Sequence, residues 1–175
     1  PSPNATLAAI AAGAYHSLGL QSDGRIVAWG RNNYSQCEVP SPNNGFAAIA
    51  AGGLHSLGLK GDGTVVTWGR NGDGECNVPS PNAGFTAIAA GDAHSLGLKS
   101  DGTIVAWGDN GAGQCAVPSP NSGFTAIAAG GLHSLGLKSD GTIVAWGDNG
   151  AGQCAVPSPN SGFAAVAARD AHSLG

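Results

Sequence analysis

Charged and aromatic residues are scarce in this chain of 175 residues. Asp, Glu, Lys and Arg together make up 10% of the sequence, Phe, Trp and Tyr make up 6%, and methionine is absent. The seven Lys and Arg residues are scattered, and a formal net charge of −4 offers no basic surface to a phosphate backbone. The composition therefore argues against nucleic-acid binding.

Long apolar runs and paired cysteines are also missing. Because no stretch of about 18 uninterrupted apolar residues occurs, we expect no membrane span in this segment. The four cysteines never form the close C-x-x-C pairs typical of zinc sites. Equivalent positions of a repeat array are usually too far apart for a disulfide, so we interpret the cysteines as small buried thiols. No metal and no cofactor are expected.

A 39-residue repeat organises what is present. Histidine, tryptophan and cysteine all recur at this interval, beginning with His16, Trp29 and Cys37. We therefore read residues 1–175 as a single array of four repeats and a half repeat. Their boundaries are 1–39, 40–78, 79–117, 118–156 and 157–175.

Each repeat is predicted to be an antiparallel β-meander. In the third repeat FTAIAAG, HSLGLK and TIVAWG read as three strands, and QCAVP would add a short fourth. The pair Asp101-Gly102 lies between the second and third strands, where a tight hairpin needs positive φ. Frequent glycine and the PSPN segment oppose a helix.

A single meander cannot bury both of its faces, so neighbouring repeats must stack. A unit of about 40 residues with a glycine-turned hairpin suits a propeller blade better than a solenoid coil. The sequence therefore predicts an all-β fold, a partial β-propeller of about four and a half blades with three or four strands each. The last repeat stops before the TIVAWG segment of its neighbours, so we expect a fragment of a larger propeller.

The repeated motif AAGxxHSLGLKSDGTIVAWGDNGAGQ resembles the regulator of chromosome condensation (RCC1) repeat. The copies are short and continue with CxVP, and in both respects they are similar to the compact propeller of the secreted bacterial β-lactamase inhibitory proteins. The resemblance implies blades of three strands in a ring of roughly seven, which this array would not close. It also favours a secreted or cell-surface location, which the sequence itself does not fix.

The repeated histidines and tryptophans are interpreted as framework, not as catalytic or metal-binding groups. No carboxylate or thiol stands at ligand spacing in the same copy, and adjacent His and Ser on a strand point to opposite faces. We therefore expect no catalytic residues and no enzymatic activity. The framework residues are His16, His55, His94, His133, Trp29, Trp68, Trp107 and Trp146.

Two short loops differ between copies: the pair before each histidine and the segment after each Trp-Gly. In a meander both loops emerge at the same end, and variable loops on a rigid framework are typical of binding sites. The resemblance implies that these loops contact a protein partner. The candidate residues are Tyr15, Arg31, Tyr34, Leu54, Arg70, Asp73, Asp92, Asp109, Leu132 and Asp148.

The leading hypothesis is a non-catalytic scaffold that binds an unidentified protein through these loops. The alternative is a structural spacer segment of a larger secreted or cell-surface protein, in which the loops drift freely. A remote alternative is guanine-nucleotide exchange, which rests on fold analogy alone.

Overall fold

The computed structural model describes residues 6–175, and these residues form strands and turns without any helix. The strands make four three-stranded antiparallel sheets and one two-stranded sheet, which we call blades 1 to 5 in chain order. The predicted all-β architecture of repeated meanders is confirmed, with three strands in each complete blade. None of the described residues forms a helix able to cross a membrane.

Every complete blade repeats the same three strands in the order inner, middle and outer. The elements are β1 (Leu7–Ala12), β2 (His16–Gln21) and β3 (Ile26–Gly30); β4 (Phe46–Ala51), β5 (His55–Lys60) and β6 (Val65–Gly69); β7 (Phe85–Ala90), β8 (His94–Lys99) and β9 (Ile104–Gly108); β10 (Phe124–Ala129), β11 (His133–Lys138) and β12 (Ile143–Gly147); and β13 (Ala167–Arg169) and β14 (His172–Leu174).

The middle and outer strands are joined by the Asp-Gly turn. In blade 2 the Lys60 N–H donates to the Thr64 carbonyl at 2.8 Å, and Gly63 between them has a φ of 81°. The Asp62 carboxylate accepts hydrogen bonds from the Thr64 N–H and hydroxyl. The predicted positive φ at this glycine is confirmed, and the side chain of the preceding aspartate fixes the turn.

The QCxVP segment forms turns in place of the fourth strand that the sequence allowed. The outer strand instead meets an asparagine of the following PSPN segment. In blade 1 the Asn43 side chain donates to the Ile26 carbonyl and accepts from the Ile26 N–H, both at 2.8 Å. One side-chain amide thus pairs with both backbone groups of Ile26 on the edge that a fourth strand would have covered.

The hydrophobic core lies between blades. One cluster joins Leu57 and Leu59 of blade 2 to Phe85 and Trp107 of blade 3, and all four are at most 5% exposed. The same composition recurs at the junctions on either side. Each core cluster combines side chains of two neighbouring blades. The stacking expected from the sequence is therefore confirmed.

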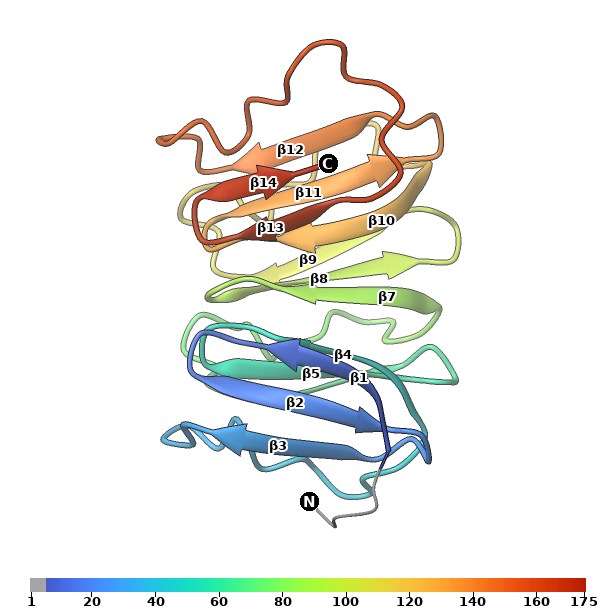
Figure 1. The fold of residues 1–175 in the computed structure, drawn as a ribbon, viewed down its shortest axis with the longest axis vertical. Helices are drawn as coiled ribbons and strands as arrows, with labels where there is room; N and C mark the ends of the chain where they lie inside the picture. Colours follow the sequence, from blue (N-terminus) through green and yellow to red (C-terminus); the bar gives the residue numbers. More distant parts are fainter. Residues whose placement is uncertain (1–5) are drawn as a thin grey trace.

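Along the long axis of the molecule, blades 1 and 2 overlap at one end, blade 3 follows, and blades 4 and 5 overlap at the other end (Figure 1). Their inner strands contact one another in sequence, from β1 through β4, β7 and β10 to β13. Alanines and glycines at the ends of these inner strands line one small hollow of about 80 Å³ that all five blades share. The inner strands therefore curve around a common axis, as in part of a propeller ring.

Candidate protein-binding face

The two variable loops of each repeat lie side by side at one end of the blades. In blade 1 the Arg31 N–H donates to the Tyr15 carbonyl at 2.9 Å, which ties the loop after Trp-Gly to the loop before His. Equivalent bonds at 2.9 Å run from Arg70 to Leu54, from Asp109 to Ala93 and from Asp148 to Leu132. We call this end of the molecule the loop face.

Blade 1 carries the aromatic part of the loop face. Tyr15 is 58% exposed and Tyr34 is 47% exposed. The Arg31 guanidinium lies 5.3 Å from the centre of the Tyr15 ring, in cation–π geometry. These three side chains are the exposed candidates of residue types that favour protein interfaces.

The loops of blades 3 and 4 are held by a buried glutamine. In blade 3 the fully buried Gln114 accepts from the Ala112 N–H and donates from Nε2 to Asp109 Oδ2, both at 2.9 Å. Gln153 holds Asp148 in the same way in blade 4. Asp109 and Asp148, both candidate binding residues, therefore also fix their own loops.

In blade 2 an Arg–Glu ion pair takes the place of the Asp–Gln hydrogen bond. Arg70 Nη1 lies 3.0 Å from Oε1 of the buried Glu75 and 2.7 Å from Asp73. The Asp73 N–H donates to Glu75 Oε2 at 2.8 Å. Arg70 and Asp73, the two candidate residues of this loop, therefore contact each other. Arg70 also neutralises the Glu75 carboxylate, whose side chain is 1% exposed.

In blade 1 this buried position is only half satisfied. Gln36 accepts from the Tyr34 N–H at 2.9 Å, but its buried Nε2 has no hydrogen-bond partner. The position of Asp109 is taken here by Arg31, which has no acceptor to offer and lies over Tyr15. This buried residue was not predicted from the sequence, although the sequence carries a signal for it: Arg70 occurs with Glu75, whereas Asp109 occurs with Gln114.

Blades 3 to 5 form the acidic part of the loop face. Asp92, Leu132, Asp148 and Asp170 line a hollow of about 210 Å³. Leu132 is 41% exposed there, whereas Leu54 of blade 2 is half-buried. The structure thus brings Asp92, Leu132 and Asp148 together, and places them on other blades than Tyr15 and Tyr34.

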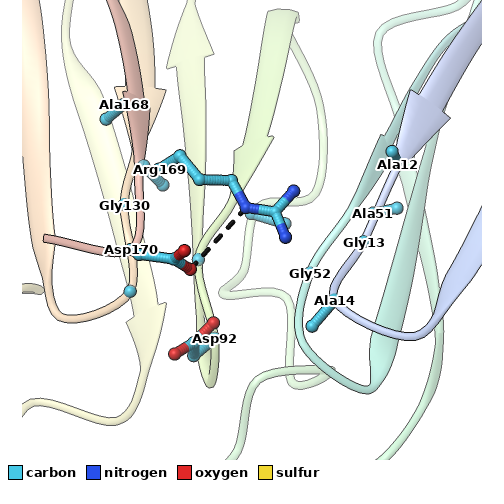
Figure 2. A pocket seen from close by; sticks show the side chains of 14 residues that line it. Ala12, Gly13, Ala14, Ala51, Gly52, Asp92, Gly130, Ala168, Arg169 and Asp170 are labelled. Atoms are coloured by element: carbon cyan, nitrogen blue, oxygen red, sulfur yellow. Dashed lines mark ion pairs between the residues drawn. The ribbon is translucent and has the colours of Figure 1, made fainter. Parts of the chain in front are cut away.

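The mouth of the axis contains a residue that the sequence analysis did not single out. Arg169 stands where the four preceding repeats have Gly13, Gly52, Gly91 and Gly130. Figure 2 shows its side chain among the alanines and glycines of the inner strands, with its Nε 3.6 Å from Asp170 Oδ1. In the sequence, this residue could have been noticed because it is the one departure from glycine among five equivalent positions.

The framework residues meet across blades. His16 Nε2 of blade 1 lies 2.8 Å from Ser56 Oγ of blade 2, and Ser56 Oγ donates to the Gln36 carbonyl at 2.9 Å. Trp68 Nε1 donates to the same carbonyl at 2.8 Å. His55 and His94 make the same contacts to Ser95 and Ser134 one and two blades further on. We call this set of contacts the junction clasp.

Although the clasp joins an imidazole to a serine, its geometry opposes nucleophilic chemistry. Because the Ser95 hydroxyl donates to the Glu75 carbonyl, it accepts from His55 Nε2–H, and this histidine cannot take its proton. Both side chains are 0% exposed, and burial together with neighbouring His94 lowers the pKa of His55 to about 3. Among residues 6–175 no cluster of three metal-ligating side chains occurs.

Two framework expectations need correction. The cysteines are half-buried, not buried, because each closes a loop: the Cys76 thiol donates to the Arg70 carbonyl at 3.2 Å, and burial raises its pKa to about 11. Trp29 is 47% exposed, whereas Trp68, Trp107 and Trp146 are at most 6% exposed. Trp29 lies on the face of blade 1 that no described blade covers, so it makes no junction clasp in the described structure.

Comparison with protein families gives one match, which covers four repeats. The model of the regulator of chromosome condensation (RCC1) repeat matches residues 8–36, 46–75, 85–114 and 124–153. These ranges cover more than half of the chain and run from the inner strand to the buried Gln or Glu of each complete blade. No curated protein sequence matches the chain.

Several solved structures share the fold. Prp20p of Saccharomyces cerevisiae is 20% identical with a TM-score of 0.84, over 99% of this chain and 56% of that one. The ectodomain of the receptor kinase CR4 of Physcomitrella patens is 28% identical with a TM-score of 0.79, over 95% of this chain and 47% of that one. The ACR4 ectodomain of Arabidopsis thaliana is 29% identical with a TM-score of 0.66, over 82% and 51%. The chain thus spans about half the length of these structures.

Proposed function

Because this chain belongs to the RCC1 repeat family, we propose that it is a non-catalytic scaffold that binds a protein partner through its loop face. The supporting observation is that repeated residues and variable residues occupy different parts of the structure. The His and Ser side chains that repeat in every complete blade form the junction clasps, whereas the exposed Tyr15, Tyr34 and Leu132 belong to the loops that differ between copies. Variable exposed residues on a fixed framework are how scaffolds acquire specificity.

Within the loop face, the blade 1 patch of Tyr15, Arg31 and Tyr34 is the proposed anchor. Tyr and Arg are over-represented among the residues that dominate interface energies, and these three are exposed. The acidic hollow around Leu132 would make a second contact on blades 3 to 5. The similar structures lend support, since yeast Prp20p has been characterised for binding to Gsp1p and histones and has been solved bound to Kap60.

The test is a triple substitution of Tyr15, Arg31 and Tyr34 by Ala in the immobilised chain. Extracts of the cells that produce the protein are passed over wild type and variant, and retained proteins are identified by mass spectrometry. We expect a partner that wild type retains and the variant loses. The matched control is Arg25→Ala, which removes an exposed arginine at the opposite, Asp-Gly end of blade 1 and should retain the partner.

Arg70 is left out of the substituted set because its loss would leave the buried Glu75 carboxylate unpaired and lower stability. Equal retention by wild type and the triple variant would contradict the blade 1 anchor, and no retained partner would favour the spacer alternative. Acceleration of nucleotide release from a small GTPase would instead favour the exchange-factor alternative, which rests only on analogy.

A further inference from the structure

In blades 3 and 4 the loop after Trp-Gly holds a carboxylate between two donors. Asp109 Oδ1 accepts from the Gly111 N–H at 2.9 Å, and its Oδ2 accepts from Gln114 Nε2 at 2.9 Å. Blade 4 repeats the two contacts around Asp148, at 3.0 and 2.8 Å. We call this pair of donors, one backbone N–H and one buried side-chain amide, the carboxylate cradle.

Blade 1 has the buried amide of this cradle but not the carboxylate. Gln36 is 0% exposed and accepts from the Tyr34 N–H at 2.9 Å, as the glutamine of blade 3 does in its own loop. Its Nε2 is buried and has no hydrogen-bond partner. The place of the aspartate is taken by Arg31, and a guanidinium has donors only. Because an unpaired buried donor is unfavourable, an acceptor brought by a ligand would be stabilised here.

The unpaired glutamine lies between two described blades. The Gln36 carbonyl accepts from Ser56 Oγ and Trp68 Nε1 of blade 2, at 2.9 and 2.8 Å. The same two kinds of contact hold Gln114 between blades 3 and 4. The two glutamines are thus anchored in the same way, although only the one in blade 3 has an acceptor for its amide.

Arg31 brings positive charge to this loop without a counter-ion. The other three arginines of the chain lie 3.8 Å or less from a carboxylate oxygen, whereas Arg31 forms no ion pair among residues 6–175. Its guanidinium lies over the Tyr15 ring. Glu38, the acidic residue of this segment, accepts from Asn32 Nδ2 at 3.1 Å instead. A carboxylate from outside would therefore meet an unpaired cation.

Blade 2 shows that an arginine at this position reaches the buried residue. Arg70 Nη1 lies 3.0 Å from Glu75 Oε1 and 2.7 Å from Asp73 Oδ2. Both of these carboxylates are replaced in blade 1, by Tyr34 and Gln36. The guanidinium of blade 1 can thus turn inward beside the buried amide, where it has no carboxylate of its own to bind.

We propose that the blade 1 loop binds a carboxylate side chain, an Asp or Glu of the protein partner, in the empty cradle. Gln36 Nε2 donates to one oxygen, and the Asn33 N–H, which corresponds to that of Gly111, donates to the other. Arg31 turns away from Tyr15 and pairs with the carboxylate. The partner therefore presents an acidic segment to blade 1. This assignment rests on the proposed function and names the chemistry of the partner.

The probe is acetyl-Asp-amide, whose only charge is its side-chain carboxylate, titrated into the isotope-labelled chain and followed by NMR of the N–H groups. We expect saturable shifts of the Gln36 side-chain amide and of the Asn33 N–H, with a Kd on the order of 1 mM. Acetyl-Asn-amide has the same shape without the charge and should bind at least about tenfold more weakly. Equal binding of the two compounds, or binding that leaves the Gln36 amide unshifted, would overturn the proposal.

Two variants with the same change of net charge locate the site. Arg31→Asp supplies the chain's own carboxylate to Gln36, as in blade 3, so it should abolish binding of the probe while the fold is kept. Arg25→Asp makes the same change at the opposite, Asp-Gly end of blade 1 and should bind the probe as wild type does. Equal binding of the probe by the two variants would overturn the proposal.

The same two variants separate this site from the proposed function, because the titration needs no partner. A partner that wild type retains should be lost by Arg31→Asp and kept by Arg25→Asp. Retention by both variants would overturn the assignment of a partner carboxylate and leave the scaffold role in place. Saturable binding of the probe without any retained protein would support the carboxylate site and contradict the scaffold role.

Discussion

The junction histidines are the residues whose charge state the fold constrains most. His55 and His94 are fully buried, and burial is the main reason that their pKa values are lowered to about 3 and about 4. Their Nδ1 atoms are buried without a hydrogen-bond partner, so an added proton would have no acceptor. The folded chain therefore holds these imidazoles neutral at pH values where the unfolded chain protonates them.

This difference predicts loss of stability in mild acid. Since the folded pKa is below the unfolded value of about 6.5, the unfolded state binds more protons below that pH. The free energy of unfolding in urea should be flat above about pH 7 and should fall steadily from about pH 6.5 toward pH 4. A flat profile across the window would contradict the prediction.

The buried position before each cysteine predicts opposite effects of one substitution in two blades. Arg31→Asp in blade 1 would give Gln36 Nε2 the carboxylate that Gln114 has in Asp109, and should raise the free energy of unfolding by about 1 kcal/mol. Arg70→Asp in blade 2 would set a second carboxylate beside the buried Glu75, and should lower it by about 3 kcal/mol. Urea unfolding measures both changes in the free energy of unfolding. Changes of the same sign would contradict the proposed pairing of the loop residue with the buried Gln or Glu.

At the scale of the element, the glycines that follow β1, β4 and β7 are each fixed by two neighbours, the histidine of their own blade and a backbone carbonyl of the next blade. A Cβ on Gly52 would lie 2.3 Å from His55 Cε1 and 2.5 Å from the Gly91 carbonyl of the next blade. We expect Gly52→Ala to cost about 1–3 kcal/mol in urea unfolding, because neither the clasp histidine nor the backbone can move away. Gly61→Ala is the matched control, since its nearest neighbour would be 3.9 Å away and three repeats have serine there. A cost within about 0.5 kcal/mol for both would be inconsistent with this role.

The elements show how far the sequence alone could lead. The strands and the Asp-Gly turns are local or periodic, so the 39-residue interval revealed them. The junction clasp was not predictable in detail, because it joins His16 to Ser56, which are 40 residues apart and meet only when blades stack. The ion pair of Arg70 with Glu75 was not predicted either. It means that Arg70, a candidate binding residue, stabilises its own loop.

At the scale of the whole molecule, blades 1 and 5 of the described residues differ from blades 2 to 4. Ile10 and Trp29 on blade 1 are 76% and 47% exposed, and Leu174 on blade 5 is 63% exposed. Leu57, Leu96 and Leu135, the equivalents of Leu174 in the inner blades, are at most 1% exposed. In a repeat array stability is close to a sum of unit and neighbour terms, so the blades covered on one side lose about half of their neighbour stabilisation.

For a polypeptide of residues 1–175, this difference predicts a gradient of local stability along the chain. Amide hydrogen exchange of the native protein, followed by mass spectrometry of peptides, should be slowest in β7 to β9 of blade 3, which has covered neighbours on both sides. It should be fastest in β13 and β14, where a two-stranded sheet meets an incompletely filled junction. Blade 1 should be intermediate, because its three strands are complete but its outer face is open. Exchange at one common rate in all five blades would mean that the array opens only as a single cooperative unit, and that the junctions outweigh the ends.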